Sequence, residues 1–469
     1  MVNIKFGTDG WRGIIADDFT FSNLAIVTQA IANYLLNLNK SGLKIVVGYD
    51  NRFLSDKFAA RVCEVLAGNG IKVLLTNSAT PTPVTAFMVK DRNADGAFML
   101  TASHNPYDYH GIKFIPEYAG PAHKGITAEI EKEIEKVELP KSLAFKKASE
   151  SGFISYYDPA ASYFAHLDNL IDKELIEKSR IKIVVDYLFG AGIGYYENYL
   201  GNLADISVLH NTKDPLFNNL YPDPVEKNLG ELRETISVTG ADLGVAFDGD
   251  ADRFGIIDEN GIFYSPNQIA SLLLPYLMET RKFRGSVYRT VATTHLLDKI
   301  ADVFEIPVVE TPVGFKYIAE GFLKDNAIFG AEESGGMSIK GHIPEKDGIL
   351  ASLLVVEMLA RTQKPLSSLW EENCDKFGCL YQERVDLHIT KEDKEKIIQK
   401  VSKFKETKIG QWELIQTINI DGKKFIFKEG WCLVRASGTE NVIRIYFETS
   451  EHDRLIKLKS DILEWLQIN

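Results

Sequence analysis

The fold is decided by three apolar runs near the N-terminus: KIVVGY at residues 44–49, KVLLT at 72–76 and AFML at 97–100. Each run has the length and apolar content expected of a buried strand. These runs alternate with helical patterns, at Leu24–Leu38 before the first run and at Asp56–Ala67 before the second. Strands that alternate with helices of this length predict βαβ units and a largely parallel sheet.

The alternation continues through two further blocks, and the last block is different. There, the helices Lys391–Phe404 and His452–Leu466 are segregated from a series of strands, which predicts an α+β domain. At about 150 residues per domain, 469 residues suggest two to four domains. We expect four, at residues 1–150, 151–256, 257–372 and 373–469. The other expected strands are 181–185, 206–209, 243–247, 254–257, 262–264, 286–289, 308–310, 327–329, 385–389, 417–420, 424–427, 431–434 and 442–448, with further helices at 157–175 and 348–360.

The composition is that of a globular, acidic protein. Apolar residues make up 45% and charged residues 25%, and 53 Lys+Arg against 65 Asp+Glu give a net charge of −12. A negative surface argues against nucleic acid or an anionic membrane as partner, because both require positive potential over a wide area. A small anionic substrate in a locally basic site remains compatible with this charge.

The chain also lacks signals for membrane insertion, export or disulfide scaffolding. No segment reaches the roughly 20 apolar residues of a membrane helix. The first residues, MVNIKFGTDGWRG, contain no apolar signal-peptide core. Four cysteines (63, 374, 379 and 432) are too few and too scattered for a disulfide framework or a zinc site. We therefore expect a cytoplasmic protein with reduced thiols.

The segment TASHNP, residues 101–106, follows the third apolar run directly. In open α/β sheets ligands bind at the carboxyl ends of strands, so this position favours a functional role for its polar residues. Ser103 is a candidate nucleophile or phosphate carrier, with His104 and Asn105 beside it. The alternative is a polar turn that caps the strand.

The segment DGDADR, residues 248–253, joins two expected strands. Its three carboxylates alternate along a tight loop, where they can converge on one hard cation such as Mg²⁺ or Ca²⁺. A surface turn is the alternative, but three unpartnered charges would repel one another. An EF-hand is excluded because position 6 is Arg253 instead of Gly and both flanks are strands. Arg253 beside a metal would suit a phosphate.

Two later segments place polar groups after expected strands. In GAEESGG, residues 330–336, Glu332 and Ser334 suit adjacent sugar hydroxyls, although a solvated acidic turn has the same pattern. RASGTEN, residues 435–441, has an Arg, hydroxyls and a Gly that suit a phosphate, or it forms an ordinary turn. GAGIG at 190–194 lacks the G-x-G-x-x-G spacing, which argues against a dinucleotide site.

Taken in order, these motifs resemble those of the α-D-phosphohexomutase superfamily, and they span nearly the whole chain. The resemblance implies three topologically similar mixed-sheet α/β domains and a C-terminal α+β domain of a different type around a central cleft. TPVGFK and HIPEKDG are most similar to the phosphoglucomutase branch. The motifs that carry the resemblance are GTDGWRG (7–13), TASHNP (101–106), DGDADR (248–253), TPVGFK (311–316), AEESGG (331–336), HIPEKDG (342–348) and RASGTEN (435–441).

The resemblance also implies roles for individual residues. Ser103 would be the phosphoserine and would hold one Mg²⁺ per chain together with Asp248, Asp250 and Asp252. Lys113, within GIKF, would transfer the proton, with His104 and His342 as competitors. The implied residues around the reacting phosphoryl group are Arg12, Lys113 and Arg253, those at the sugar are Thr311, Lys316, Glu332 and Ser334, and those at the other phosphate are Lys346, Arg435, Ser437, Gly438 and Thr439.

The implied activity is that of a phosphoglucomutase, which interconverts glucose 1-phosphate and glucose 6-phosphate through glucose 1,6-bisphosphate, also the activator. The sugar loop departs from this branch at Ala331 and Gly335, and it lacks the Gly-His pair that phosphoglucosamine mutases and many phosphomannomutases place after the serine. Mannose and glucosamine phosphates therefore stay open as substrates. Two rival functions are a metal-dependent sugar phosphatase and a silent sugar-phosphate sensor. We expect a small sugar phosphate as the partner, no nucleic acid or membrane, and a monomer or homodimer.

Overall fold

The N-terminal part of the chain, domain I, is built on a six-stranded sheet of order β1-β5-β4-β2-β3-β6. The computed structural model describes residues 4–6, 10–437 and 441–467. The three apolar runs form β2, β3 and β4 in chain order. Strand β2 lies between the other two and pairs with both in parallel, as predicted. The strands are β1 (Trp11–Ile14), β2 (Lys44–Tyr49), β3 (Lys72–Thr76), β4 (Gly96–Leu100), β5 (Tyr109–Pro116) and β6 (Ile154–Tyr157), and the helices are α1 (Phe21–Asn37), α2 (Ser55–Gly68), α3 (Thr82–Asp91), α4 (Lys124–Ile134) and α5 (Phe145–Glu150).

Domain II follows with a five-stranded sheet of order β11-β10-β9-β7-β8. Its strands are β7 (Lys182–Asp186), β8 (Asp205–Leu209), β9 (Leu243–Phe247), β10 (Phe254–Asp258) and β11 (Phe263–Tyr264). Its helices are α6 (Ala160–Leu167), α7 (Lys173–Ser179), α8 (Tyr195–Leu200) and α9 (Gly230–Thr239), with 3₁₀ turns at Gly201–Leu203, Phe217–Asn219 and Glu226–Asn228.

Domain III has a four-stranded sheet of order β13-β12-β14-β15. Its strands are β12 (Ser286–Thr290), β13 (Val308–Thr311), β14 (Ala327–Ala331) and β15 (Met337–Ile339), and its helices are α10 (Pro266–Arg281), α11 (Leu296–Val303), α12 (Phe315–Lys324), α13 (Gly348–Thr362) and α14 (Leu366–Phe377).

The same four-strand unit occurs in all three domains. In each, a central strand pairs in parallel with the next two strands of the chain, and the second of these pairs antiparallel with the strand that follows. The units are β3-β2-β4-β5, β8-β7-β9-β10 and β13-β12-β14-β15. This common topology confirms the expected fold class of three similar mixed-sheet domains.

Domain IV is an antiparallel six-stranded sheet of order β16-β21-β20-β19-β18-β17 with both helices packed on one face. Along β20, side chains alternate: Cys432 and Val434 face the helices, whereas Trp431 and Leu433 pack on Val291 of domain III. The strands are β16 (Tyr381–His388), β17 (Lys408–Ile409), β18 (Trp412–Ile418), β19 (Lys423–Phe427), β20 (Gly430–Ala436) and β21 (Val442–Thr449), and the helices are α15 (Lys391–Lys403) and α16 (His452–Leu466).

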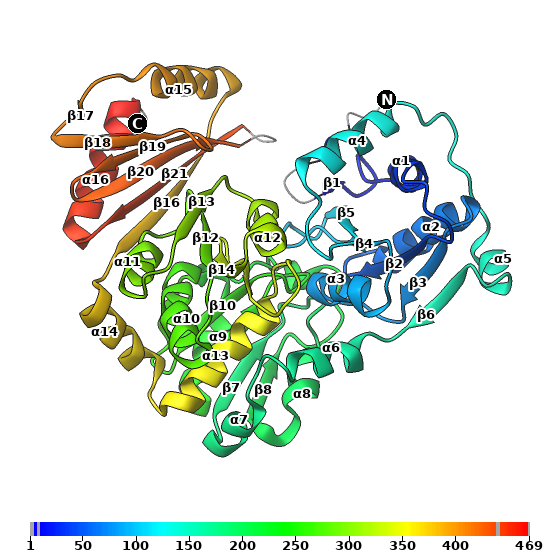
Figure 1. Cartoon of the computed structure of the whole chain (residues 1–469), viewed down its shortest axis with the longest axis horizontal. Coiled ribbons are helices and arrows are strands. Elements are labelled where there is room, and N and C mark those ends of the chain that lie inside the picture. The colour runs from blue at the N-terminus through cyan, green and yellow to red at the C-terminus, as the bar shows by residue number, and fades with distance from the viewer. Residues whose placement is uncertain (1–3, 7–9, 438–440, 468–469) are drawn as a thin grey trace.

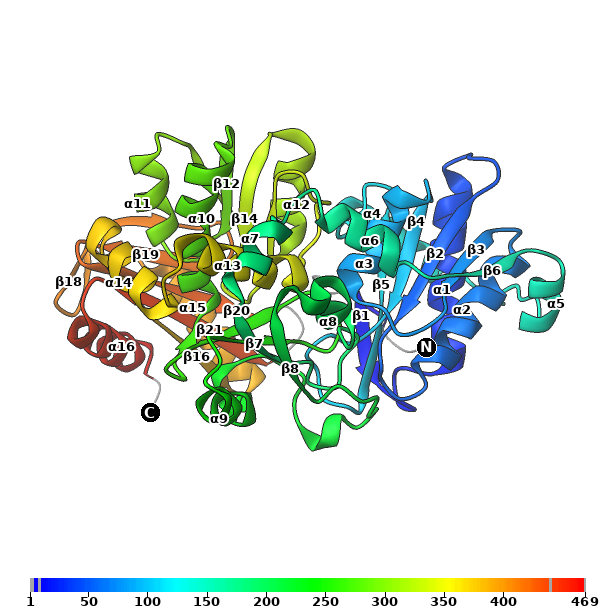
Figure 2. The ribbon, with the colours of Figure 1, turned by 90° about the horizontal axis from the view of Figure 1, so that it is seen from below.

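Domains I and IV lie at opposite ends of the molecule, with domains II and III between them (Figures 1 and 2). One large apolar core runs from α3 of domain I through domain II to α13 and α14 of domain III, and separate cores lie on the α1 and α2 side of domain I and within domain IV. The first three domains are therefore packed as one body. None of the helices in the described ranges has the length and apolar character needed to cross a membrane.

One expected helix is wrong. The run from residue 157 to 175 forms two helices, α6 and α7, instead of one. Asp172 begins the second helix, because its carboxylate accepts the Leu175 N–H at 3.2 Å as an N-cap. The strand expected at 417–420 also lies earlier, at Trp412–Ile418.

The expectation that all four cysteines are thiols is wrong for two of them. Cys374, in the last turn of α14, forms a disulfide with Cys379. Gly378 ends the helix with φ 85°, a left-handed conformation that suits glycine, and turns the chain back toward Cys374. The disulfide therefore closes the short connection that leads from domain III to domain IV. Cys63 and Cys432 are free and buried.

Candidate active site

Three loops occupy the same position in the repeated four-strand unit, between its third and fourth strands. They are 101–108 between β4 and β5, 248–253 between β9 and β10, and 332–336 between β14 and β15. Each loop begins at the carboxyl end of a strand that is parallel to the centre of its sheet, the usual place for ligand contacts in α/β sheets. The loops carry Ser103, the acidic triad and Glu332.

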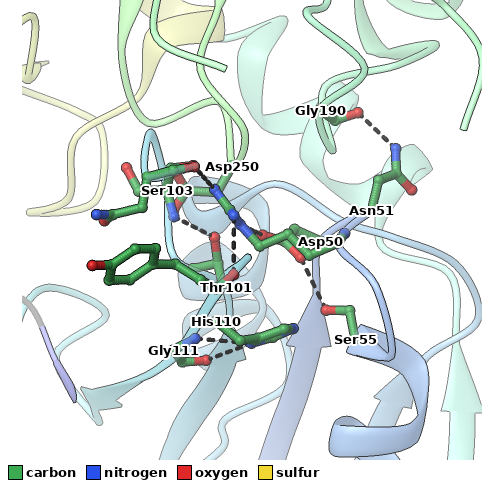
Figure 3. A network of polar contacts seen from close by, with 12 residues as sticks. Asp50, Asn51, Ser55, Thr101, Ser103, His110, Gly111, Gly190 and Asp250 are labelled. Carbon is green, nitrogen blue, oxygen red and sulfur yellow. Dashed lines mark hydrogen bonds and ion pairs between the residues drawn. The ribbon is translucent and has the colours of Figure 1, made fainter. Parts of the chain in front are cut away.

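The Ser103 hydroxyl contacts the acidic loop of domain II, residues 248–253. Its Oγ donates to Asp248 Oδ2 at 2.7 Å and is 3.3 Å from Nδ1 of His104. The backbone of Ser103 is left-handed, with φ 52°, and its N–H donates to Thr101 Oγ1 at 2.8 Å. This is a sparsely populated conformation for a residue with a Cβ, and such residues cluster at functional sites. Figure 3 shows Ser103 near Thr101 and Asp250.

Asp248, Asp250 and Asp252 form a buried triad whose ligand atoms all lie within 4.8 Å of one another. Lys113 Nζ is 2.8 Å from both Asp250 Oδ2 and Asp252 Oδ2, and Lys346 Nζ is 3.1 Å from Asp252 Oδ2. The sequence argument treated these carboxylates as unpartnered, and the structure corrects that assumption. Repulsion alone therefore no longer argues for a metal.

The triad nevertheless fits a divalent cation. Within the described part of the chain, Asp250 Oδ1 and Asp252 Oδ1 are buried and accept no hydrogen bond. Together with the neighbouring hydroxyl of Ser103 they form an all-oxygen donor set, which hard cations such as Mg²⁺ prefer.

Burial and neighbouring charges shift the pKa values of several ionisable groups in the site. Burial, and then the carboxylates of Asp250 and Asp252, hold the pKa of Asp248 well above its ordinary value. Burial also raises the pKa of Asp250, but Lys113, the Thr82 hydroxyl and Lys346 together outweigh it and the net shift is downward. Burial and the nearby charges of Arg253 and Arg12 hold the pKa of His104 well below its ordinary value, so its imidazole is neutral.

Two arginines complete the basic side of the site. The backbone N–H of Arg253 donates to Asp248 Oδ1 at 3.0 Å, and the guanidinium Nε is 3.9 Å from Asp252 Oδ1. Arg12 reaches the serine loop through Asn105, to whose Oδ1 its Nη1 donates at 2.7 Å. His342 lies elsewhere: its ring contacts His166 at 3.0 Å and Asp347 at 3.1 Å.

The residues expected to hold the sugar gather in domain III. Glu332 is buried, and its Oε1 accepts the N–H of Gly314 at 3.0 Å. Burial raises the pKa of Glu332 to about 7. Ser334 is half-buried in the turn that follows, and Lys316 is buried in the first turn of α12. Thr311 ends β13, and its hydroxyl donates to the Pro312 carbonyl at 3.0 Å.

The expected phosphate residues of domain IV connect to domain III. Arg435 Nε donates to Asp421 Oδ2 at 2.8 Å, and the same oxygen accepts the N–H of Val313 at 3.2 Å. The carbonyl of Ser437 accepts from Lys394 Nζ at 2.7 Å. Gly438 and Thr439 lie outside the described residues. The described contacts thus link Ser103, Lys113, Arg253, Lys346 and the triad directly, and link Arg435 to the 311–316 loop.

The sequence argument missed several residues that contact the site. Arg52 donates to three carbonyls of the serine loop and to that of Tyr109 at the start of β5, and Thr82 Oγ1 donates to Asp250 Oδ2 at 2.5 Å. Asp421 bridges two domains, as described above. Arg52 lies three residues after the end of β2, as Ser103 lies three residues after β4, so the rule that drew attention to Ser103, a polar group after a buried strand, also points to it. Nothing in the sequence pairs Thr82 or Asp421 with its partner.

Four family models match the chain in sequence order. They are phosphoglucomutase/phosphomannomutase alpha/beta/alpha domains I, II and III, at residues 3–141, 161–261 and 265–377, and the C-terminal domain at 388–464. The chain belongs to the phosphoglucomutase/phosphomannomutase family. Members of this family are phosphohexomutases, and the chain is accordingly an intramolecular phosphotransferase.

Relatives within the family carry different activities in their names. A phosphoglucomutase/phosphomannomutase of Thermococcus kodakarensis is 32% identical over 96% of this chain and 95% of the relative. A probable phosphoglucosamine mutase of the same organism is 33% identical over 97% and 96%. A solved structure of a Thermus thermophilus protein, named as a phosphomannomutase, has a TM-score of 0.87 at 32% identity, covering 99% of both chains. The family is therefore clear from these likenesses, whereas the sugar is not.

Proposed function

We propose that this chain is a phosphoglucomutase that interconverts glucose 1-phosphate and glucose 6-phosphate. The supporting observation is the contact of Ser103 Oγ with Asp248, in a buried triad surrounded by Lys113, Lys346 and Arg253. A hydroxyl in such surroundings suits a phosphate carrier, because phosphoryl transfer is catalysed mainly by positioning and by neutralisation of charge.

In the proposed cycle, phosphorylated Ser103 donates its phosphoryl group to the free hydroxyl of a bound sugar monophosphate. The resulting 1,6-bisphosphate turns over in the site and returns its other phosphate to Ser103. Lys113 or the neutral His104 would carry the hydroxyl proton, because His104 lies beside the serine and Lys113 beside the triad. Arg253 and Arg12 would offset the charge on the transferred group. Since the phosphate returns to the protein, none is lost to water.

One Mg²⁺ per chain would be held by Asp248, Asp250, Asp252 and an oxygen on the Ser103 phosphate. It would supply positive charge opposite the phosphoryl oxygens. The oxygens of Asp250 and Asp252 that accept no hydrogen bond in the described residues support this assignment. A related fold, N-acetylphosphoglucosamine mutase of Aspergillus fumigatus, is solved with GlcNAc-6P and magnesium, and a variant of it with glucose 1,6-bisphosphate. We propose glucose 1,6-bisphosphate as the activator.

At the sugar, Glu332 and Ser334 would bind neighbouring hydroxyls, with Thr311 and Lys316 beside them. The other phosphate of the sugar would be bound by Lys346 and by residues of domain IV, namely Arg435, Ser437, Gly438 and Thr439. All of these residues belong to one chain, so a monomer suffices and a homodimer is compatible. A cytoplasmic location stays a prediction.

Phosphomannomutase or phosphoglucosamine mutase activity is the second candidate, because relatives with these names match as well as the others do. The test is kcat/KM for glucose, mannose and glucosamine 1-phosphates, measured side by side. We expect glucose 1-phosphate to be preferred by about tenfold or more. A higher value for either of the other sugars would establish the second candidate instead.

The role of Ser103 is tested by Ser103→Ala, with Ser78→Ala on the surface of the same domain as control. We expect Ser103→Ala to lose at least about 1,000-fold in kcat, since no other group takes the phosphoryl. Wild-type protein treated with glucose 1,6-bisphosphate should gain about 80 Da on Ser103. Full activity of Ser103→Ala would contradict the proposal. Stoichiometric release of inorganic phosphate would indicate a phosphatase.

A further inference from the structure

The nucleophile loop, residues 101–108, has no regular secondary structure, yet Ser103 within it must face the acidic triad. A buried side chain from another part of domain I accounts for its shape. Arg52 follows β2, and its side chain is fully buried. It is separated from the loop by about 50 residues of sequence.

The four Nη donors of Arg52 all bind carbonyls of the loop or of Tyr109, the first residue of β5. Nη2 donates to the carbonyls of Ser103 and Asn105, both at 2.6 Å. Nη1 donates to the carbonyls of Pro106 at 2.6 Å and Tyr109 at 3.1 Å. Arginine has five N–H donors in a planar fork, and these four bonds use the four on its Nη atoms. One of the carbonyls belongs to the candidate phosphate carrier itself.

The fifth donor faces a carboxylate that is itself held in place. Arg52 Nε lies 3.2 Å from Asp50 Oδ2, and the other oxygen of Asp50 accepts the Arg52 N–H at 3.0 Å and the Ser55 hydroxyl at 2.9 Å. Figure 3 shows Asp50 between Ser55 and the serine loop. Arg52 Nε and Asp50 Oδ2 form an ion pair without hydrogen-bond geometry, so the carboxylate attracts the base of the fork by charge.

Asn51, which lies between Asp50 and Arg52, connects the same turn to domain II. Asn51 Nδ2 donates to the carbonyls of Phe189 at 3.2 Å and Gly190 at 2.8 Å. The next residue, Ala191, donates its N–H to the carbonyl of Gly249 at 2.9 Å, within the acidic loop. The Asn51–Gly190 contact is also visible in Figure 3. The 50–52 turn therefore contacts the nucleophile loop on one side. On the other side it contacts residues 189–190, next to Ala191, which binds the acidic loop.

The repeated domain unit supplies an internal comparison. In domain II the equivalent strand β7 ends at Asp186, whose Oδ1 accepts the N–H of Leu188 at 2.9 Å, as Asp50 accepts that of Arg52. The turn is thus common to both domains, but the arginine is replaced by an apolar residue. The fold of the unit does not require a guanidinium here. The arginine occurs in the domain that carries the serine.

We propose that Arg52 is a positioning residue for phosphoryl transfer, which holds the Ser103 loop in register with the acidic triad. This inference rests on the proposed function of Ser103 as the phosphate carrier. Lysine has only three donors on a single atom and leaves at least one of the four carbonyls without a partner. A displacement of about 1 Å at a reacting group costs about 100-fold in rate.

The test compares Arg52→Lys with Arg61→Lys, a partly exposed arginine on α2 of the same domain that pairs with Glu64. For each folded variant we measure kcat, KM for glucose 1-phosphate, the thermal midpoint, and phosphorylation of Ser103 by intact mass. We expect kcat of Arg52→Lys to fall about 30- to 100-fold, with KM within about threefold of wild type. Arg61→Lys should match wild type.

An unchanged kcat in Arg52→Lys overturns the proposal. A loss of kcat that only follows the unfolded fraction also overturns it, because that would show a purely structural role. Should Arg52→Lys fail to fold, the isosteric Asp50→Asn loosens the same guanidinium. Its kcat should fall about three- to tenfold at constant KM, and an unchanged kcat would again refute the idea.

The proposed function and the positioning role fail in different ways. When wild-type protein takes no phosphate from glucose 1,6-bisphosphate on Ser103, the proposed function fails. When wild type is phosphorylated and active and Arg52→Lys equals it, only the positioning role of Arg52 fails.

Discussion

Glu332 is the residue whose ionisation should be visible in the pH dependence of sugar binding. Burial raises the pKa of Glu332 to about 7, with Lys346 and Arg253 acting against the shift and Glu333 adding to it. The carboxylate, as the form that accepts hydrogen bonds from sugar hydroxyls, predominates above that pH. We therefore expect kcat/KM to fall as the pH decreases through about 7, mainly through a rise in KM.

The pH profile of Glu332→Gln isolates this contribution. Sugar phosphates themselves titrate near pH 6, so part of any acid limb belongs to the substrate. The limb near 7 should be missing in Glu332→Gln and present in Glu320→Gln, whose side chain is exposed on α12. The same limb in both variants would contradict the assignment. The free energy of unfolding should change in the opposite direction from activity. Because the folded protein disfavours the ionised carboxyl of Glu332, this residue lowers stability as the pH rises from 4.5 to about 7.

At the scale of elements, the nucleophile loop and the acidic loop are in backbone contact. A Cβ on Gly249 would lie 2.5 Å from the carbonyl oxygen of Ser103, which Arg52 holds from the other side. We expect Gly249→Ala to separate the loops and to cost about 1–3 kcal/mol of unfolding free energy. Activity should fall at least about tenfold. Chemical denaturation and kcat measure the two effects.

Gly230→Ala is the matched control for this prediction. Gly230 begins α9 in the same domain, and a Cβ there meets nothing within 4 Å. Alanine should be neutral or add up to about 1 kcal/mol by restricting the unfolded chain. Wild-type activity in Gly249→Ala would show that the two loops need not touch.

The acidic loop should also report metal binding through stability. A ligand that binds only the folded protein stabilises it by about 2.7 kcal/mol at a concentration 100 times its Kd. We expect Mg²⁺ to raise the thermal midpoint of wild type, and chelation by EDTA to reverse the rise. Asp250→Asn should lose this response, whereas Asp242→Asn, which lies before β9 outside the loop, should keep it. Equal shifts in both variants would place the metal elsewhere.

At the scale of the whole molecule, a buried lysine of domain IV contacts domain III. Lys424 of β19 donates to Glu310 Oε1 and to the Val291 carbonyl, both at 2.9 Å, and lies 4.0 Å from the ring of Trp431. Glu310 and Val291 belong to domain III. This ion pair and the apolar contacts around Trp431 join the two domains.

Lys424→Met should therefore weaken the interface between domains III and IV. Glu310 keeps its ion pair with Arg289 at 2.6 Å, but the buried Val291 carbonyl loses its donor, so we expect a cost of about 1–3 kcal/mol. Lys408→Met, at an exposed position on β17, should stay within about 0.5 kcal/mol of wild type. Urea unfolding followed by tryptophan fluorescence measures both. Equal stability of the two variants would show that the apolar contacts alone hold domain IV.

Local patterns in the sequence were enough to predict α/β blocks followed by an α+β domain, and the chemistry-bearing segments; the three similar mixed-sheet domains followed from the resemblance to the family. Buried strands such as Lys44–Tyr49 and Leu243–Phe247 are marked by their own apolar residues, and the polar motifs follow them directly. The helix expected at 157–175 and the reduced state of Cys374 and Cys379 were wrong, since a cap and a chain reversal decided them. The domain limits and the residue roles stay predictions.

Which groups meet was decided by the tertiary structure alone. Ser103 and Asp248 are 145 residues apart, and Lys113 and Asp250 are 137 apart. Arg52 was missed for the same reason: its partners are backbone carbonyls, which every residue carries and which no sequence pattern marks. The packing of three repeated units brings their equivalent loops together, and contacts across such separations depend on that packing rather than on local propensity.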